Sequence, residues 1–177
     1  MPYDSGIVMT ADRDAHLAAM TISGAYLVKH EDRDRDRADW VPEASRRLRG
    51  AAIYATIRAL GRNGIAAMVE GCCAHARRLA ERLGAEPGIE ILNQVVINQV
   101  LARFADAGDD SDKAADAFTR KVIAAVQRDG TCWLGETTWR GMVAMRVSVS
   151  NWRTSAADME RSIDAILACH AKERAKA

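Results

Sequence analysis

Three arginines that follow a serine are the first residues with a potential chemical role. They are Ser45, Arg46, Arg47 and Arg49. We expect Ser45 to cap a helix that runs to Leu60, because a serine oxygen accepts hydrogen bonds from the free N–H groups of a first turn. The helix dipole disfavours cations there by a few tenths of a kcal/mol each. The arginines therefore indicate an anionic partner, either a ligand or carboxylates such as Asp39 and Glu43, and the spacing leaves both open. Gly50, a poor helix former, predicts that another backbone lies close.

Tyr26 is the second candidate, because it lies near a stretch of alternating charge. Residues 31–37 are all charged, and their sign changes at every step from Asp32 to Arg37. This pattern is typical of a solvated, mobile loop. A tyrosine beside such a loop is either an apolar anchor or a catalytic acid, and the spacing alone favours the anchor.

The composition is that of an ordinary globular protein. Of the 177 residues, 49% are apolar and 28% are charged, and the net charge is +1. We therefore expect no binding to nucleic acid and none to an anionic membrane. No apolar run approaches the roughly 20 residues that cross a bilayer. The first residues lack the basic and apolar regions of a signal peptide, so we expect a cytoplasmic protein.

Residues typical of metal and cofactor sites are scattered along the chain. The cysteines lack C-x-x-C spacing and the histidines lack ligand spacing, so we expect reduced thiols and no metal site. The five lysines all lie in polar surroundings, unlike the buried amine that covalent cofactor chemistry requires. Glycine-rich phosphate loops and G-x-S-x-G elbows are also missing from the sequence.

Hydrophobic periodicity predicts the elements that must position these residues. In order, they are a buried strand at 5–10, helices at 12–20 and 45–60, a break at 61–64, a helix at 65–83, strands at 89–91 and 95–104, a helix at 112–129, strands at 131–134 and 142–150 joined by a connection at 135–141, and a helix from 154 or 155. Residues 61–177 therefore predict an α+β domain with helices on one face of a mostly antiparallel sheet. Residues 1–60 are too few to form a complete core.

Seven segments carry a resemblance that covers the whole chain in order. They are PYDSG (2–6), YL (26–27), PEASRRLRG (42–50), ALGRNG (59–64), LNQVVINQV (92–100), GTCW (130–133) and MRVSVSNW (145–152). In them the chain resembles the C-terminal part of the group II pyridoxal-phosphate-dependent decarboxylases, which include the aromatic-L-amino-acid decarboxylases. That family has the aspartate aminotransferase fold (fold type I), a dimer with a large cofactor domain and a small C-terminal α+β domain. The resemblance implies that residues 1–60 are a remnant of the large domain, with its mobile loop and a junction helix, and that 61–177 are the small domain.

The resemblance also implies which residues do chemistry. Tyr26 matches the family's mobile-loop tyrosine, which protonates the carbanionic intermediate after carbon dioxide leaves. Tyr3 matches an aromatic position near the cofactor lysine, and Ser45 matches a position that lines the substrate pocket. In the complete enzyme pyridoxal 5'-phosphate is the electron sink. Its lysine and phosphate site are expected upstream of Met1, so we expect that this chain alone does not bind the cofactor stably.

These inferences predict the C-terminal part of an amino-acid decarboxylase that acts on an aromatic amino acid and is inactive as an isolated chain. The expected partners are the amino-acid substrate and a second protein chain, in a homodimer or in a pair with a chain that carries the missing half. The alternative is a non-catalytic dimerisation or regulatory module derived from such an enzyme. Apolar surface left uncovered by an absent large domain would favour that alternative.

Overall fold

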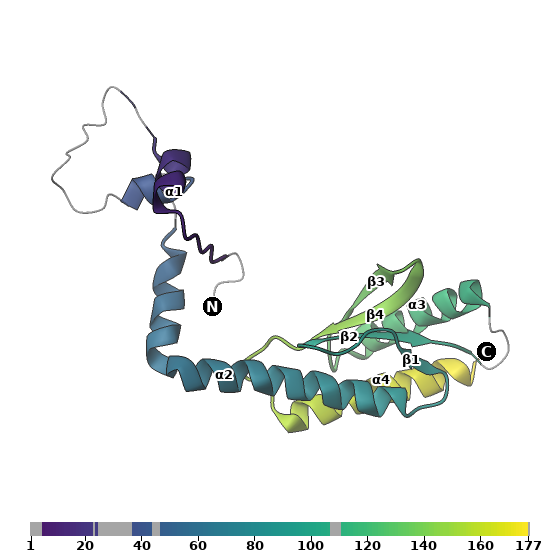
Figure 1. Cartoon of the computed structure of the whole chain (residues 1–177). Coiled ribbons are helices and arrows are strands. Elements are labelled where there is room, and N and C mark those ends of the chain that lie inside the picture. Colours follow the sequence, from purple (N-terminus) through teal and green to yellow (C-terminus); the bar gives the residue numbers. More distant parts are fainter. Residues whose placement is uncertain (1–4, 23, 25–36, 44–46, 107–110, 177) are drawn as a thin grey trace. The chain divides into compact units, whose positions relative to one another are not determined.

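The chain divides into two compact units. The computed structural model describes residues 5–22, 24, 37–43, 47–106 and 111–176. The units are Met1–Arg62 and Asn63–Ala177, and helix α2 (Arg49–Gly84) has residues in both (Figure 1). Within the described ranges, no helix has the length and apolar character needed to cross a membrane.

The first unit contains a short capped helix, as its sequence predicts. Helix α1 (Arg13–Met20) begins after Asp12, whose side chain accepts a 2.9 Å hydrogen bond from the N–H of Ala15. The one-turn helix η1 (Arg37–Trp40) contacts α1, since Nε2 of His16 lies 3.2 Å from the carbonyl oxygen of Trp40.

Two expectations for this unit are wrong. Residues 5–10 form no strand, no described segment pairs with them, and Met9 is 91% exposed. A lone strand leaves its backbone groups without partners, so this apolar run stays irregular. At Gly50 a Cβ atom would meet no described residue within 4 Å, so none of the described backbone requires a glycine there.

Helix α2 starts later than the sequence indicates. Arg47 precedes its first turn, which leaves Arg49 inside that turn. The predicted conflict between arginines and the helix dipole is therefore smaller than expected. The predicted break is confirmed, because Gly61 leaves helical geometry with φ 62° and ψ −173°. Only glycine adopts that region readily.

The second unit is built on a four-stranded antiparallel sheet. Its strands are β1 (Ile89–Ile91), β2 (Gln99–Phe104), β3 (Gly135–Trp139) and β4 (Met142–Ser148), in the order β1-β2-β4-β3. Strands β2 and β4 are therefore the inner strands. The predicted α+β fold with an antiparallel sheet is confirmed.

The hairpin between β3 and β4 is displaced from its predicted position. Residues 131–134 form no strand, and most of the predicted connection at 135–141 is β3 itself. The turn consists of Arg140 (φ 50°) and Gly141 (φ 85°), the two positive φ values of a type I′ turn. Gly135 opens the strand instead of the turn, and the threonines and Trp139 that follow it favour β structure.

Three helices bury one face of this sheet. They are the second half of α2, α3 (Asp112–Asp129) and α4 (Ala156–Arg174), which Figure 1 shows beside the strands. The fully buried side chains of this core are Ala76, Leu79, Leu83, Val100, Ala102, Phe104, Val122, Val126, Met145, Ile163 and Ile166. The predicted helices at 65–83, at 112–129 and from 154 or 155 are confirmed, and each buries one side against this core.

Polar side chains attach α3 to the inner strands. Asp116 accepts hydrogen bonds from Nη2 of Arg103 at 2.9 Å and from the N–H of Val143 at 3.0 Å. The hydroxyl of Thr119 accepts from the N–H of Phe104 at 3.0 Å and donates to its carbonyl at 3.2 Å. Each buried group left unpaired would cost about 1–3 kcal/mol, so these bonds set where α3 lies on the sheet.

His170 places an ionisable ring inside the core. It is 4% exposed, and its ring centroid lies 5.4 Å from that of Phe104 and 6.0 Å from that of Phe118. Its Nε2 has no hydrogen-bond partner within the described structure. Burial lowers the pKa of His170, the charge of Arg174 lowers it further, and Glu86 opposes the shift. The imidazole is therefore neutral in the folded protein at neutral pH.

Gly88, just before β1, permits a close backbone contact, whereas Gly141, in the hairpin turn between β3 and β4, makes no such contact. At φ +85° a Cβ on Gly88 would lie 2.8 Å from the carbonyl oxygen of Ala105, whereas a Cβ on Gly141, also at φ +85°, would meet nothing within 4 Å. Both alanine variants should lose about 1–2 kcal/mol of stability through the left-handed backbone. Gly88→Ala should lose about 1–3 kcal/mol more through the overlap. Urea unfolding of the two variants measures this difference, and equal losses would contradict it.

Candidate functional site

The sheet face opposite the helices carries the candidate site. Successive residues of a strand point to opposite faces. In β4 the fully buried Met145 faces the helices, and the exposed Arg146 faces away from them. Leu101 of β2 and Gly135 of β3 lie opposite Arg146 in the register and share its face. A guanidinium group therefore stands on an inner strand of the uncovered face.

A hollow of about 780 Å³ lies on this face, and we call it the sheet-face hollow. It is lined by Leu92, Asn93, Gln94, Val96, Ile97, Asn98, Gln99, Leu101, Thr137, Trp139, Arg140 and Arg146. Its volume falls within the range of small-molecule sites, about 300–1,000 Å³. The lining contains amide, aromatic and cationic groups but no carboxylate.

Two asparagines shape the loop beside the hollow. Oδ1 of Asn93 accepts from the N–H of Leu101 at 2.8 Å, and Nδ2 of Asn98 donates to the carbonyl of Val149 at 2.9 Å. These side chains take the place of strand partners. Residues 95–98, predicted as the start of a strand, are consequently a loop.

The two arginines of the hollow have no acidic partner in the part of the chain that the structure describes. Neither Arg140 nor Arg146 forms an ion pair with a carboxylate of the described residues. Arg78 and Arg120, by contrast, lie 2.8 Å and 3.1 Å from glutamate oxygens. Cζ of Arg140 instead lies 5.6 Å from the ring centroid of Trp139. The hollow therefore presents two uncompensated positive charges, which attract anions.

Arg140 occupies a strained backbone position. Its φ of 50° lies in the left-handed region, which costs a residue with a side chain roughly 1–2 kcal/mol. Asparagine or glycine is usual at this position of a type I′ turn. The turn thus keeps an arginine where asparagine would be more stable, and such strain is common at functional sites.

The hollow is suited to binding and orientation rather than to proton transfer. A guanidinium donates two parallel hydrogen bonds to a carboxylate or a phosphate. Guanidinium, amide, hydroxyl and indole groups do not titrate near neutral pH. The described lining can therefore hold an anion, and it offers no general acid or base.

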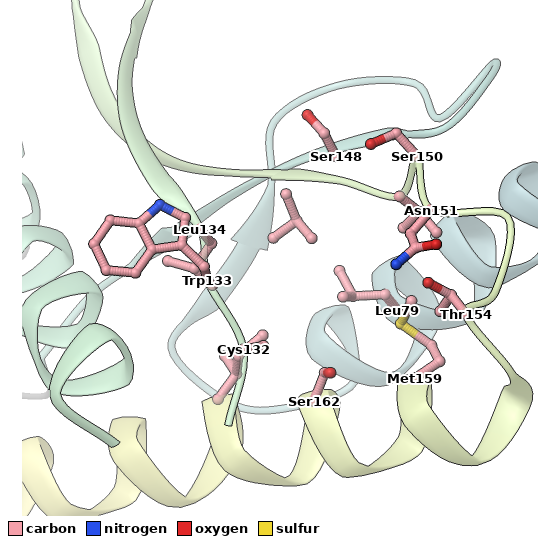
Figure 2. Close-up of a pocket in the computed structure, with 13 residues that line it drawn as sticks. Leu79, Cys132, Trp133, Leu134, Ser148, Ser150, Asn151, Thr154, Met159 and Ser162 are labelled. Carbon is pink, nitrogen blue, oxygen red and sulfur yellow. The ribbon is translucent and has the colours of Figure 1, made fainter. Parts of the chain in front are cut away.

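A smaller pocket of about 160 Å³ lies between α4, the end of β4 and the segment 131–134 (Figure 2). Its hydroxyl groups belong to Ser148, Ser150, Thr154 and Ser162. Figure 2 shows the indole of Trp133, which is 80% exposed, projecting away from the centre of the pocket. Burial raises the pKa of the Cys132 thiol, which therefore stays protonated at neutral pH. This lining is uncharged and supplies no nucleophile.

The site residues assigned by resemblance, Tyr3, Tyr26 and Ser45, lie outside the described residues, so their roles stay predictions. The described lysines are all exposed: Lys113, Lys121, Lys172 and Lys176. None of these described amines fits the covalent attachment of a cofactor. All four cysteines are free in the structure. Among the described residues no group of three or more His, Cys, Asp and Glu side chains is placed to hold a metal ion.

Sequence reasoning missed both arginines of the hollow. Arg146 lies in the MRVSVSNW segment, where strict alternation places it on the face opposite Met145 and Val147. That pattern was a usable signal. Arg140 carried only the weaker signal of an Arg-Gly pair after an aromatic residue, because the turn itself was misplaced.

The chain is similar to several proteins of known activity. Residues 1–105 match the family described as "Pyridoxal-dependent decarboxylase conserved domain". L-2,4-diaminobutyrate decarboxylase of Rhizobium meliloti (strain 1021) is 27% identical over 168 residues, which cover 93% of this chain and 33% of that protein. Tyrosine decarboxylase 2 of Arabidopsis thaliana is 23% identical over 141 residues, which cover 78% of this chain and 26% of that protein.

A solved structure shares the fold. The crystal structure of Oryza sativa TDC with PLP and tryptamine superposes with a TM-score of 0.79 at 16% identity, and covers 88% of this chain and 33% of that one. The chain thus spans about a third of the length of such relatives, 33% in two cases and 26% in another. The predicted fold, the C-terminal end of an aspartate-aminotransferase-type enzyme, is confirmed.

Proposed function

Since this chain belongs to the pyridoxal-dependent decarboxylase family, we propose that it forms the C-terminal part of a pyridoxal-phosphate-dependent amino-acid decarboxylase. The family membership confirms the resemblance read from the sequence, and the family depends on pyridoxal phosphate. Relatives are named for diaminobutyrate and for tyrosine. The side chains of diaminobutyrate and tyrosine differ, so these names support an amino-acid substrate without indicating which side chain it carries.

The unpaired guanidinium of Arg146 carries this proposal. Every α-amino acid presents a carboxylate, and a guanidinium holds one with two parallel hydrogen bonds. Arg146 lies on an inner strand, between Leu101 and Gly135, so its backbone is held rigidly. We assign it the substrate carboxylate. This contact orients the substrate and transfers no proton.

The described residues do not supply the amine that would hold the cofactor. Each described lysine is exposed on a helix or at the end of the chain. The fifth lysine, Lys29, lies outside the described residues and in the sequence adjoins the charged stretch 31–37, which is unlike the surroundings of a cofactor amine. We therefore assign the cofactor lysine and the phosphate site to a part of the enzyme outside these 177 residues. On this basis the chain alone does not bind the cofactor stably.

Chemical labelling tests this assignment. After incubation with pyridoxal phosphate and reduction with borohydride, peptide mass spectrometry should find no lysine labelled preferentially, because exposed amines react alike. The urea-unfolded chain is the control, and carbon dioxide release from labelled amino acids should stay at background. Stoichiometric labelling of one lysine in the folded chain alone would contradict the proposal.

Arginine substitution tests the carboxylate contact. L-glutamine, an amino acid with a neutral side chain, is titrated into the full chain and followed by NMR shifts. Arg146→Gln should weaken binding roughly ten- to hundred-fold, because a hydrogen bond to a charged group contributes about 1.5–3 kcal/mol. Arg77→Gln, at an exposed position of α2, is the matched control and should leave the affinity unchanged. Equal affinities of the wild type and Arg146→Gln would exclude this role.

A non-catalytic dimerisation module is the second candidate function. Exposed apolar side chains on the first half of α2 favour it. Tyr54, Ile57 and Leu60 are 66%, 46% and 43% exposed, and their spacing of three places them along one side of the helix. Such a stripe suits pairing with a second copy, or with a chain that carries the rest of the enzyme.

Light scattering coupled to size exclusion tests the second candidate. It predicts a dimer for the unmodified chain and a monomer for Ile57→Glu, since a buried unpaired charge is strongly unfavourable. Val69→Glu, at another exposed apolar position of α2 (48% exposed), serves as the control and should remain dimeric. A wild-type monomer at every concentration would reject self-pairing.

A further inference from the structure

We infer that the sheet-face hollow binds a dicarboxylate, with one acid group on Arg146 and the other on Arg140. The inference rests on the proposed function in one respect, because Arg146 is the residue assigned to the substrate carboxylate. It adds Arg140 as a second anion contact. It therefore assigns a substrate with an acidic side chain, in place of the aromatic amino acid expected from the sequence.

The two guanidinium groups stand at separate places along one hollow. Arg146 pairs with Gly135 near the start of β3, and Arg140 follows Trp139 at the end of that strand. The four residue steps from Met142 to Arg146 span about 13 Å at the rise of a strand. Both arginines line the same hollow of about 780 Å³. One small anion such as phosphate would engage a single arginine, whereas two acid groups on one carbon chain can reach both.

The charge of the hollow supports an anionic ligand with two charges. No carboxylate lines it, and neither arginine forms an ion pair with any other described residue. A ligand with one charge would leave the second guanidinium uncompensated. Asn93 and Asn98 also line the hollow, but their side chains are neutral and their amide groups are bound to the backbone. The arginines are therefore the groups that distinguish ligands by charge.

The backbone of Arg140 is an independent observation. Its positive φ of 50° lies in a turn whose first position is best filled by asparagine or glycine. An arginine at this position, with its Cζ 5.6 Å from the ring centroid of Trp139, indicates a use for its charge. The same strain supplies a favourable test, because Arg140→Asn removes the charge and relieves the backbone.

The ligand chemistry has two sources: an amino acid with an acidic side chain, and a free dicarboxylic acid. Three probes separate them. L-glutamate and L-glutamine have nearly the same shape and differ by one negative charge, while glutarate keeps both acid groups and lacks the amine. Each is titrated into the full chain at constant ionic strength and followed by NMR shifts. The proteins are the wild type, Arg140→Asn, Arg146→Gln and the control Arg77→Gln.

We expect the wild type and Arg77→Gln to bind L-glutamate at least about ten-fold more tightly than L-glutamine. Arg140→Asn should bind the two equally, with its affinity for glutamine unchanged and its melting temperature equal to or above that of the wild type. Glutarate binding as well as glutamate supports a general dicarboxylate site, and weaker glutarate binding supports the amino acid.

Equal affinity of the wild type for glutamate and glutamine overturns the inference. So does a preference for glutamate that survives in Arg140→Asn. Failure of the proposed function gives a different result. The affinity for L-glutamine is then the same in the wild type and in Arg146→Gln, whether or not the wild type prefers glutamate to glutamine.

Discussion

Burial of one face of the sheet is the constraint on which the second unit depends. Because side chains alternate along a strand, packing Met145 against α3 and α4 forces Arg146 onto the other face. A shift of one residue in register would place the arginine in the core, where an unpaired charge is very costly. The hydrophobic core therefore fixes the position of the candidate site as well as the fold.

Polar contacts hold the two inner strands, β2 and β4, at both ends. Asp116 joins Arg103 of β2 to the backbone of Val143 in β4, at the end where the ladder between these strands stops at Ala102 and Met145. At the other end Asn98 binds the backbone of Val149. The inner strands are thus held at both ends, and the hollow lies on a rigid support, as an orienting site requires.

Elements with strong periodicity are predicted correctly from the sequence. Elements whose formation depends on contact with a distant segment are not. The helices predicted at 112–129 and from 154 or 155 both form: Phe118 and Val126 bury one face of α3, and Ser155 and Asp158 form a capping box at the start of α4. These signals are local. The apolar run at 5–10 forms no strand because a strand needs a neighbour, and Gly135 opens β3 because pairing with Arg146 outweighs its turn preference. Alternation in the sequence is enough to place Arg146 opposite Met145. Only the register of β3 and β4, with its turn, shows that Arg140 lies at the same hollow.

The buried ring of His170 makes the stability of the fold depend on pH. Its folded-state pKa lies below the ordinary value of 6.5, so the unfolded chain binds more protons than the folded chain in that range. The stability that comes from burying the neutral ring is fully present above the ordinary pKa and declines as the pH falls through and below it. The ring lies between Phe104 and Phe118, which also join the sheet to α3. Mild acid therefore weakens the packing through which the sheet and α3 meet around His170.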